Sequence, residues 1–378
     1  MRVDNLDANI DYFLTVATHL PGTLSPHVVL VERAGRDPMI VVARLEERRF
    51  PVKVGYRELV RPRLRSIVVA FDGILGAETP ADLETCVEAL GESLRGRGID
   101  AVVLQKVAVD SPVFEAAARL GRRSRLRGLP SATRWLLDLP DSMEALLERR
   151  SAKARKETRY EERKLLRTYE DDVLVERLDL GPRDRLRADM EAVAQTTYQR
   201  ALGVGGGESG LDDALTELGL DNGWLRVWML YLRGVPVAFW KGTAQGHVFA
   251  TDTPGYDPAY AKDRVGTYVM HAMLADLCAD PAITVVDFGH GDAEYKRRYS
   301  TRSVEQQDVV LLARRPRPAM VGGFVSSTAA VNRLAYRLLG STGFAARLRR
   351  RWRTRLSTSN PTPGSTTTPT SASAPTDE

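Results

Sequence analysis

Short apolar runs recur along the chain and are separated by turn-forming residues or by amphipathic segments. Apolar runs bounded by Gly, Pro or Asp predict strands, while apolar residues that recur every three or four positions predict helices. Strands are expected at 27–34, 38–45, 65–71, 100–107 and about 131–138, and again at 173–178, 225–232, 235–242, 246–252, 283–289 and 304–314. Helices are expected at about 81–97, 111–121, 143–166, 183–199, 264–279 and 292–299, and a basic helix at about 327–356.

The order of these elements is the same in both halves of the chain. Each half reads as three strands, a loop and helix, a buried strand, a short helix and a last strand, which predicts a tandem pair of α/β units with mixed sheets. The predicted divisions are 1–138, 139–315, a basic helical region at 316–356 and a tail at 357–378. The tail is rich in Ser, Thr and Pro and lacks aromatic residues, so we expect it to be disordered.

Composition and charge narrow the class of protein only slightly. The chain has 378 residues and a formal charge of +5, so CoA, nucleic acid and anionic lipid all fit as partners. Cys86 and Cys278 are too few and too far apart for a disulfide framework, which favours a cytoplasmic protein. The histidines show no metal-ligand spacing, and no apolar stretch approaches the roughly 18 residues of a membrane span. We therefore expect no metal and a protein that is soluble or peripheral to a membrane.

The segment from Phe249 to Lys296 carries the clearest chemical signal. A strand and a turn-rich loop precede a helix that has Gly266 and Thr267 in its first turn, with Lys262 and Arg264 beside it. The start of a helix presents unpaired backbone N–H groups and the positive end of the helix dipole, and glycine lets a ligand approach closely. This pattern predicts a phosphate site, although a glycine here also fits a packing role.

The runs FATDTPGYDPAYAKDRVGTYVM and VVDFGHGDAEYKRRY resemble the CelD-like branch of the GNAT acyltransferases, which are distant relatives of FemAB-type peptidyltransferases. The matching elements are Gly255-Tyr256-Asp257-Pro258, Tyr260, Gly266, Asp287-Phe288, Gly291-Asp292 and Tyr295-Lys296. The resemblance is clearest over about 222–313 and lacks the multi-glycine loop of the most familiar GNATs. It implies tandem GNAT-like domains and an acyl-CoA co-substrate, most simply acetyl-CoA.

The resemblance also implies where the donor binds. The pyrophosphate of the CoA ester is expected at the helix start, and its pantetheine between strands 246–252 and 283–289. Backbone N–H groups of the first strand, at Phe249 and Ala250, are expected to polarise the thioester carbonyl.

Two residues are candidates for proton transfer. Asp287 interrupts an apolar strand, so it is either a general base or is paired with Lys296, with a nearby arginine or with the following loop. Tyr295 is expected to protonate the thiolate leaving group, as tyrosines often do in this fold, or else to pack one ring face. For His290, an exposed loop position is favoured over a proton shuttle.

Acceptor-binding residues are expected on either side of these. Asp252 and Tyr256 lie just past the first strand and are expected to line the acceptor side, and Lys296 is expected to hold an anion or to form an ion pair. The basic helix at 148–167 places Arg155 and Arg159 one turn apart. They either face an anionic substrate or belong to a solvated helix.

Near the C-terminus, Phe344, Leu348, Trp352 and Leu356 recur every four residues among arginines. This pattern fits a helix at an anionic membrane surface, or one docked on the domain by its apolar stripe. Three functions remain open: acyl transfer from acyl-CoA to a primary amine or amino sugar of a cell-surface polysaccharide, FemAB-like transfer from aminoacyl-tRNA, and non-catalytic binding of an anion. Nucleic acid other than tRNA is not expected as a partner.

Overall fold

The computed structural model describes residues 5–55, 57–96, 98–121, 124–170, 172–196, 209–252 and 254–339. The first half contains η1 (Leu6–Ala8), α1 (Ile10–His19), β1 (Thr23–Val31), β2 (Met39–Arg49), β3 (Val52–Val54), β4 (Arg57–Val60), β5 (Arg63–Leu75), α2 (Pro80–Glu92), η2 (Ser93–Arg95), β6 (Ala101–Ala108), α3 (Pro112–Leu120) and β7 (Ser131–Asp138). The predicted segment 344–356 and the predicted tail lie outside the described residues.

The second half contains α4 (Met143–Glu148), α5 (Ala152–Thr168), β8 (Val173–Arg177), η3 (Leu178–Leu180), α6 (Arg183–Thr196), α8 (Ser209–Asp221), β9 (Leu225–Leu232), β10 (Val235–Gln245), β11 (Val248–Thr251), β12 (Gly255–Tyr256), η4 (Pro258–Asp263), α9 (Val265–Ala279), β13 (Val285–His290), α10 (Glu294–Tyr299), β14 (Arg302–Leu312) and α11 (Pro316–Leu339). None of the described helices is long and apolar enough to cross a bilayer.

The two halves repeat one α/β unit, as the sequence predicts. In the first, β2 lies antiparallel to β5, and β5 lies parallel to β6 with α2 as the crossover. In the second, β10 lies antiparallel to β11, and β11 lies parallel to β13 with α9 as the crossover. A helical crossover is what a parallel pair requires. The α/β class with tandem GNAT-like units is therefore confirmed.

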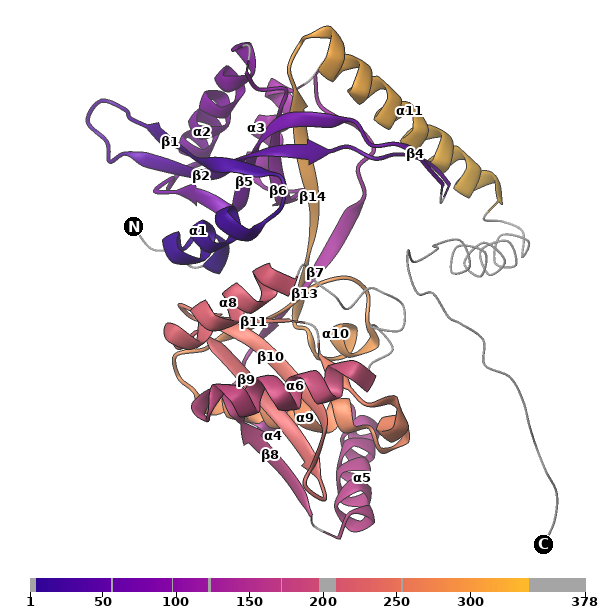
Figure 1. The fold of residues 1–378 in the computed structure, drawn as a ribbon. Coiled ribbons are helices and arrows are strands. Elements are labelled where there is room, and N and C mark those ends of the chain that lie inside the picture. Colours follow the sequence, from indigo (N-terminus) through magenta and orange to yellow (C-terminus); the bar gives the residue numbers. More distant parts are fainter. Residues whose placement is uncertain are drawn as a thin grey trace, which may run out of the picture.

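The last strand of each unit pairs with the other unit. The main sheet runs β1-β2-β5-β6-β14-β7-β13-β11-β10-β9-β8, so β7 of the first half lies beside β13 and β14 of the second half lies beside β6. Figure 1 shows β7 and β14 running together where the two units meet. The sheet is thus continuous across the predicted division at residue 138, and that division stays a prediction.

Two predicted helices differ from those in the structure. The helix expected over 143–166 is interrupted, because the Ser151 hydroxyl accepts from the Ala154 N–H and starts α5 anew after α4. The helix expected from about 327 begins earlier, at Pro316, since proline is well tolerated in a first helical turn.

The core of the second unit is formed by α9 against the sheet. Eight residues of α9 are buried: Val265, Val269, Met270, His271, Met273, Leu274, Leu277 and Cys278. Full burial of one large aliphatic side chain contributes about 1.5–3 kcal/mol. This face fixes α9 against β9, β10 and β11, and with it the position of its N-terminus.

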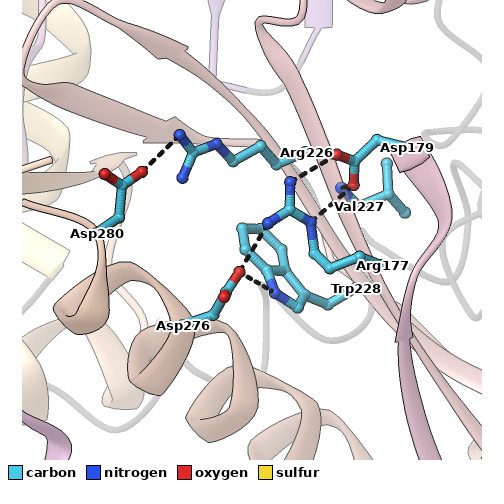
Figure 2. A network of polar contacts seen from close by, with 7 residues as sticks. All are labelled: Arg177, Asp179, Arg226, Val227, Trp228, Asp276 and Asp280. Atoms are coloured by element: carbon cyan, nitrogen blue, oxygen red, sulfur yellow. Dashed lines mark hydrogen bonds and ion pairs between the residues drawn. The ribbon is translucent and has the colours of Figure 1, made fainter. Parts of the chain in front are cut away.

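A polar network holds the other end of α9 (Figure 2). Arg177 of β8 donates to Asp179 and, over 2.7 Å, to Asp276 of α9. The Trp228 indole N–H donates to the same Asp276 over 3.0 Å, and Arg226 donates to Asp280 over 2.7 Å. The last turn of α9 is therefore tied to β8 and β9.

Candidate functional site

The strands β11 and β13 begin side by side and then separate. Their parallel pairing runs from Val248–Val285 to Ala250–Asp287 and continues no further, although β13 extends to His290. Side chains alternate along each strand, so Phe249 and Phe288 lie in the core under α9 while Ala250 and Asp287 face the other side. The pairing of the two strands thus ends between the core under α9 and the other face of the sheet.

On one face the N-terminus of α9 is open. Arg264 precedes it in a left-handed conformation (φ 57°), and no side chain caps the helix. Among the described residues, no acceptor meets the N–H groups of Val265 and Gly266. Both neighbouring cations, Lys262 and Arg264, are exposed, and Arg264 pairs with Glu161 at 3.3 Å.

Steric crowding inside the protein does not explain the glycine at position 266. A Cβ at this position would meet the Tyr256 ring at 3.7 Å, an ordinary van der Waals distance. The φ of Gly266 is not positive either. Neither crowding nor a positive φ therefore requires the glycine, and its role in letting a phosphate approach the backbone stays a prediction.

The corresponding helix of the first unit is closed. The Thr79 hydroxyl accepts from the Asp82 N–H, and the Asp82 carboxylate accepts from the Thr79 N–H, which forms a capping box at the start of α2. Hydrogen bonds from Thr79, and the nearby Arg36, hold the pKa of Asp82 below its usual value. Asp82 also pairs with Arg33 at 2.6 Å. An ionised carboxylate thus occupies the position that a phosphate needs.

On the opposite face, the separated strands open into a cavity of about 560 Å³ between the two units. The second unit contributes Ala250, Thr251, Asp252, Asp287 and His290 to its wall. The first unit contributes Asp7, Tyr12, Asp72, Lys106 and Arg134. Five carboxylates line the cavity, against three side chains with a permanent positive charge: Asp7, Asp72, Asp212, Asp252 and Asp287 against Lys106, Arg134 and Lys241. The cavity is therefore acidic overall.

Asp287 is held by Arg134 of β7. The guanidinium donates to its Oδ2 over 2.9 and 2.8 Å, and the Gly289 N–H donates to its Oδ1 over 2.8 Å. The structure thus realises the paired interpretation of Asp287, with the arginine supplied by the other unit. Its carboxylate still lines the cavity.

Lys241 of β10 also lines the cavity. Its ammonium lies 2.9 Å from Asp252 and 3.8 Å from Asp212. Burial disfavours its charge, but the two carboxylates raise its pKa above the ordinary value. Asp252 therefore lines the cavity, and its role in binding an acceptor stays a prediction.

Tyr295 lies on the other face, with the start of α9. Its ring packs edge-on against Trp240 and Phe288, at centroid distances of 5.3 and 5.7 Å. The Trp240 indole N–H in turn donates to the Gly266 carbonyl over 3.0 Å. Burial raises the pKa of Tyr295 to about 12, so its hydroxyl is protonated at neutral pH.

The structure separates the remaining predicted residues. Tyr256 packs near Gly266 at the helix start instead of lining the cavity. Lys296 is buried and donates to the His290 carbonyl over 2.6 Å, and burial lowers its pKa. Arg155 and Arg159 lie on α5, outside the cavity wall, and Arg155 donates to the Glu148 carbonyl over 3.4 Å. Their roles in binding stay predictions.

His290 corrects one expectation. It is not an exposed loop residue but the half-buried last residue of β13, where its Nε2 lies 2.6 Å from the Gln306 amide oxygen. Burial lowers its pKa. It lines the cavity as a neutral side chain at neutral pH.

The cavity also contains residues that the sequence pattern did not single out. Arg134 and Lys241 interrupt apolar strands just as Asp287 does, so the same signal marks them. Asp7 and Tyr12 carry no such signal, because they reach the site from the far end of the chain. Burial raises the pKa of both, against the opposing effect of Lys106 at Asp7.

Comparison with known proteins finds similarity in the second half. Residues 152–297 match the family described as acetyltransferase (GNAT) domain. A conserved protein of unknown function from Bacteroides thetaiotaomicron superposes with a TM-score of 0.50 at 13% identity, covering 82% of this chain and 92% of the other. The structure of FemX superposes with a TM-score of 0.52 at 12% identity, covering 82% and 98%. No curated protein sequence matches significantly.

Proposed function

We propose that this chain, which carries a GNAT domain in residues 152–297, transfers an acyl group from acyl-CoA to a primary amine. One observation supports this above the others. An open helix N-terminus lies on one face of the sheet and a carboxylate-lined cavity on the other, and the pairing of β11 with β13 ends between them. A thioester lying where the pairing ends is reached by an amine from the far side.

The donor is proposed to bind at the second unit only. Its phosphates meet the open N–H groups of Val265 and Gly266, with Lys262 and Arg264 beside them. The first unit offers the Asp82 carboxylate at the equivalent place, which would repel a phosphate. Acetyl-CoA is the simplest donor to test.

The proposed chemistry needs no covalent enzyme intermediate. The acceptor ammonium first gives one proton to a cavity carboxylate, and the resulting amine nitrogen bonds to the thioester carbon. The bond from that carbon to sulfur then breaks, and the second nitrogen proton passes to water as the amide forms. Backbone N–H groups near Phe249 and Ala250 polarise the carbonyl. Tyr295, protonated at neutral pH, gives its proton to the departing thiolate.

The acceptor is proposed to carry positive charge. Carboxyl groups outnumber cations around the cavity, which favours an ammonium group over an anion there. An amino sugar of a cell-surface polysaccharide and a basic amine both satisfy this requirement. Since acyl-CoA esters are made inside the cell, the reaction is placed in the cytoplasm.

Substitution of Gly266 tests the proposal. Gly266→Glu adds a carboxylate at the helix start, and we expect loss of acetyl-CoA binding in calorimetry because it repels the pyrophosphate. Gly96→Glu is the matched control. A Cβ at position 96 would likewise lie 3.7 Å from the nearest atom, but this glycine is not in α9, so binding should be unchanged. Failure of the unmodified protein to bind any CoA ester would refute the proposal and leave a non-catalytic role.

Transfer from aminoacyl-tRNA is the second candidate. It is favoured by an exposed basic stripe along α5, comprising Lys153, Lys156, Arg159, Arg163 and Arg167. Retention of charged tRNA on a filter with a steep salt dependence, together with no affinity for CoA esters, would select this function.

A further inference from the structure

The helix α11 has apolar residues on two faces. Val321 and Val325 face inward and pack on the cluster around Leu312. A Cβ at Gly322 would come within 2.3 Å of the Leu312 side chain, so the helix lies very close to the sheet. The inward face alone accounts for the docking of α11.

The outward face of α11 is apolar as well. Met320, Phe324 and Val331 follow one another by four and seven residues and are 59%, 58% and 56% exposed. This is the spacing of a single helical stripe. Large apolar side chains on a solvent-facing stripe indicate an interaction surface.

The β3–β4 hairpin lies beside α11 and also exposes apolar side chains. It forms a separate two-stranded sheet whose strand β3 contacts α11 (Figure 1). Val54, Leu59 and Val60 of the hairpin are 42%, 60% and 57% exposed. We call these six side chains and their two elements the α11–hairpin surface.

The charge of this surface is mostly positive. Among the side chains that the structure describes there, the basic residues outnumber the single acidic residue, Glu58, which pairs with Arg61. The basic residues are Lys53, Arg57, Arg61, Arg63 and Arg317. Apolar side chains among basic ones match the boundary of an anionic bilayer, where the apolar groups enter roughly 5–10 Å and the cations meet lipid phosphates.

We propose that the α11–hairpin surface docks the protein on an anionic membrane. Docking there leaves the cavity between the units, formed by different elements, free to take its acceptor.

Co-sedimentation of the full chain with lipid vesicles tests the proposal. We expect binding to vesicles of phosphatidylcholine with phosphatidylglycerol, and little binding to phosphatidylcholine alone. Phe324→Glu and Leu59→Glu should each weaken the partition about tenfold or more, because burial of a large apolar side chain is lost. Leu30→Glu is the matched control, since Leu30 of β1 is 57% exposed, and it should bind as the unmodified protein does.

Other outcomes overturn the proposal. If both variants bind as well as the unmodified protein while Trp352→Glu abolishes binding, segment 344–356 alone contacts the membrane. If Phe324→Glu instead turns a dimer into a monomer in light scattering, a second copy covers the surface. Acetyl transfer to a soluble amine should be the same in Phe324→Glu, so loss of docking is separable from failure of the proposed function.

Discussion

One residue step along β13 separates two environments. The Asp287 carboxylate faces the cavity and accepts from Arg134 and Gly289, while the next side chain, Phe288, packs against Tyr295 in the core. In the proposed reaction, the two proton transfers therefore take place on opposite faces of the sheet. Asp287 already accepts hydrogen bonds from Arg134 and Gly289 and forms an ion pair with Arg134. We therefore propose that it positions Arg134 at least as much as it accepts a proton.

Tyr295 gives the prediction at this scale. Tyr295→Phe keeps the ring contacts with Trp240 and Phe288 but removes the proton donor, so kcat with acetyl-CoA and an accepted amine should fall about 100-fold. A group with a pKa of about 12 is protonated below that pH, so the pH profile between 6 and 9 should keep its shape. Tyr256→Phe, at an exposed tyrosine, should leave kcat unchanged. An unaltered kcat in Tyr295→Phe would leave only the packing role.

The sequence could predict part of this site. A charged residue inside an apolar run is costly to bury, so Asp287 stood out, and by the same reasoning Arg134 and Lys241 were detectable. That Arg134 is the partner of Asp287 was not detectable, because the pairing depends on a strand from the other unit. Asp7 and Tyr12 lie in ordinary sequence surroundings and enter the cavity only through the tertiary fold.

At the scale of elements, α9 is the part on which the site depends. The buried face of α9 fixes the distance of the helix from the sheet. The polar network in Figure 2 holds its C-terminal turn in place. The sequence predicted this helix almost to the residue, because its apolar periodicity is strong. It did not predict the break at Ser151, where a serine N-cap starts α5 anew within a polar stretch.

The network around Asp276 gives the prediction at this scale. Asp276→Ala leaves the N–H of Trp228, a buried side chain, without an acceptor, and should lower the free energy of unfolding by about 1–3 kcal/mol. Asp276→Asn retains an oxygen acceptor and should cost less. The ion pair itself contributes little because Asp276 is 44% exposed. Urea unfolding of the three proteins measures the difference, and equal losses in both variants would assign the stability to charge instead.

At the scale of the molecule, the two units share their last strands. β14 completes the first unit at β6, and β7 completes the second at β13, so neither half of the chain contains all the strands of its own sheet. The sequence predicted the order of elements in each half but not this exchange, because strand patterns record burial and not the identity of the neighbour. The exchange also brings Arg134 to the reaction site and closes the cavity with residues from both halves.

Shared strands should make the two units unfold together. Four of the five tryptophans are Trp135, Trp224, Trp228 and Trp240, so fluorescence reports on β7 and the second unit, while far-ultraviolet circular dichroism reports on both. Leu90→Ala in α2, in the core of the first unit, should destabilise by about 2–5 kcal/mol and shift both signals to the same lower urea midpoint. Leu277→Ala in α9 should act in the same way from the other side. If the fluorescence transition stays in place in Leu90→Ala, each unit is stable without the strand that it receives. The first unit would then release β14 at a lower urea concentration than the one at which the second unit loses its core.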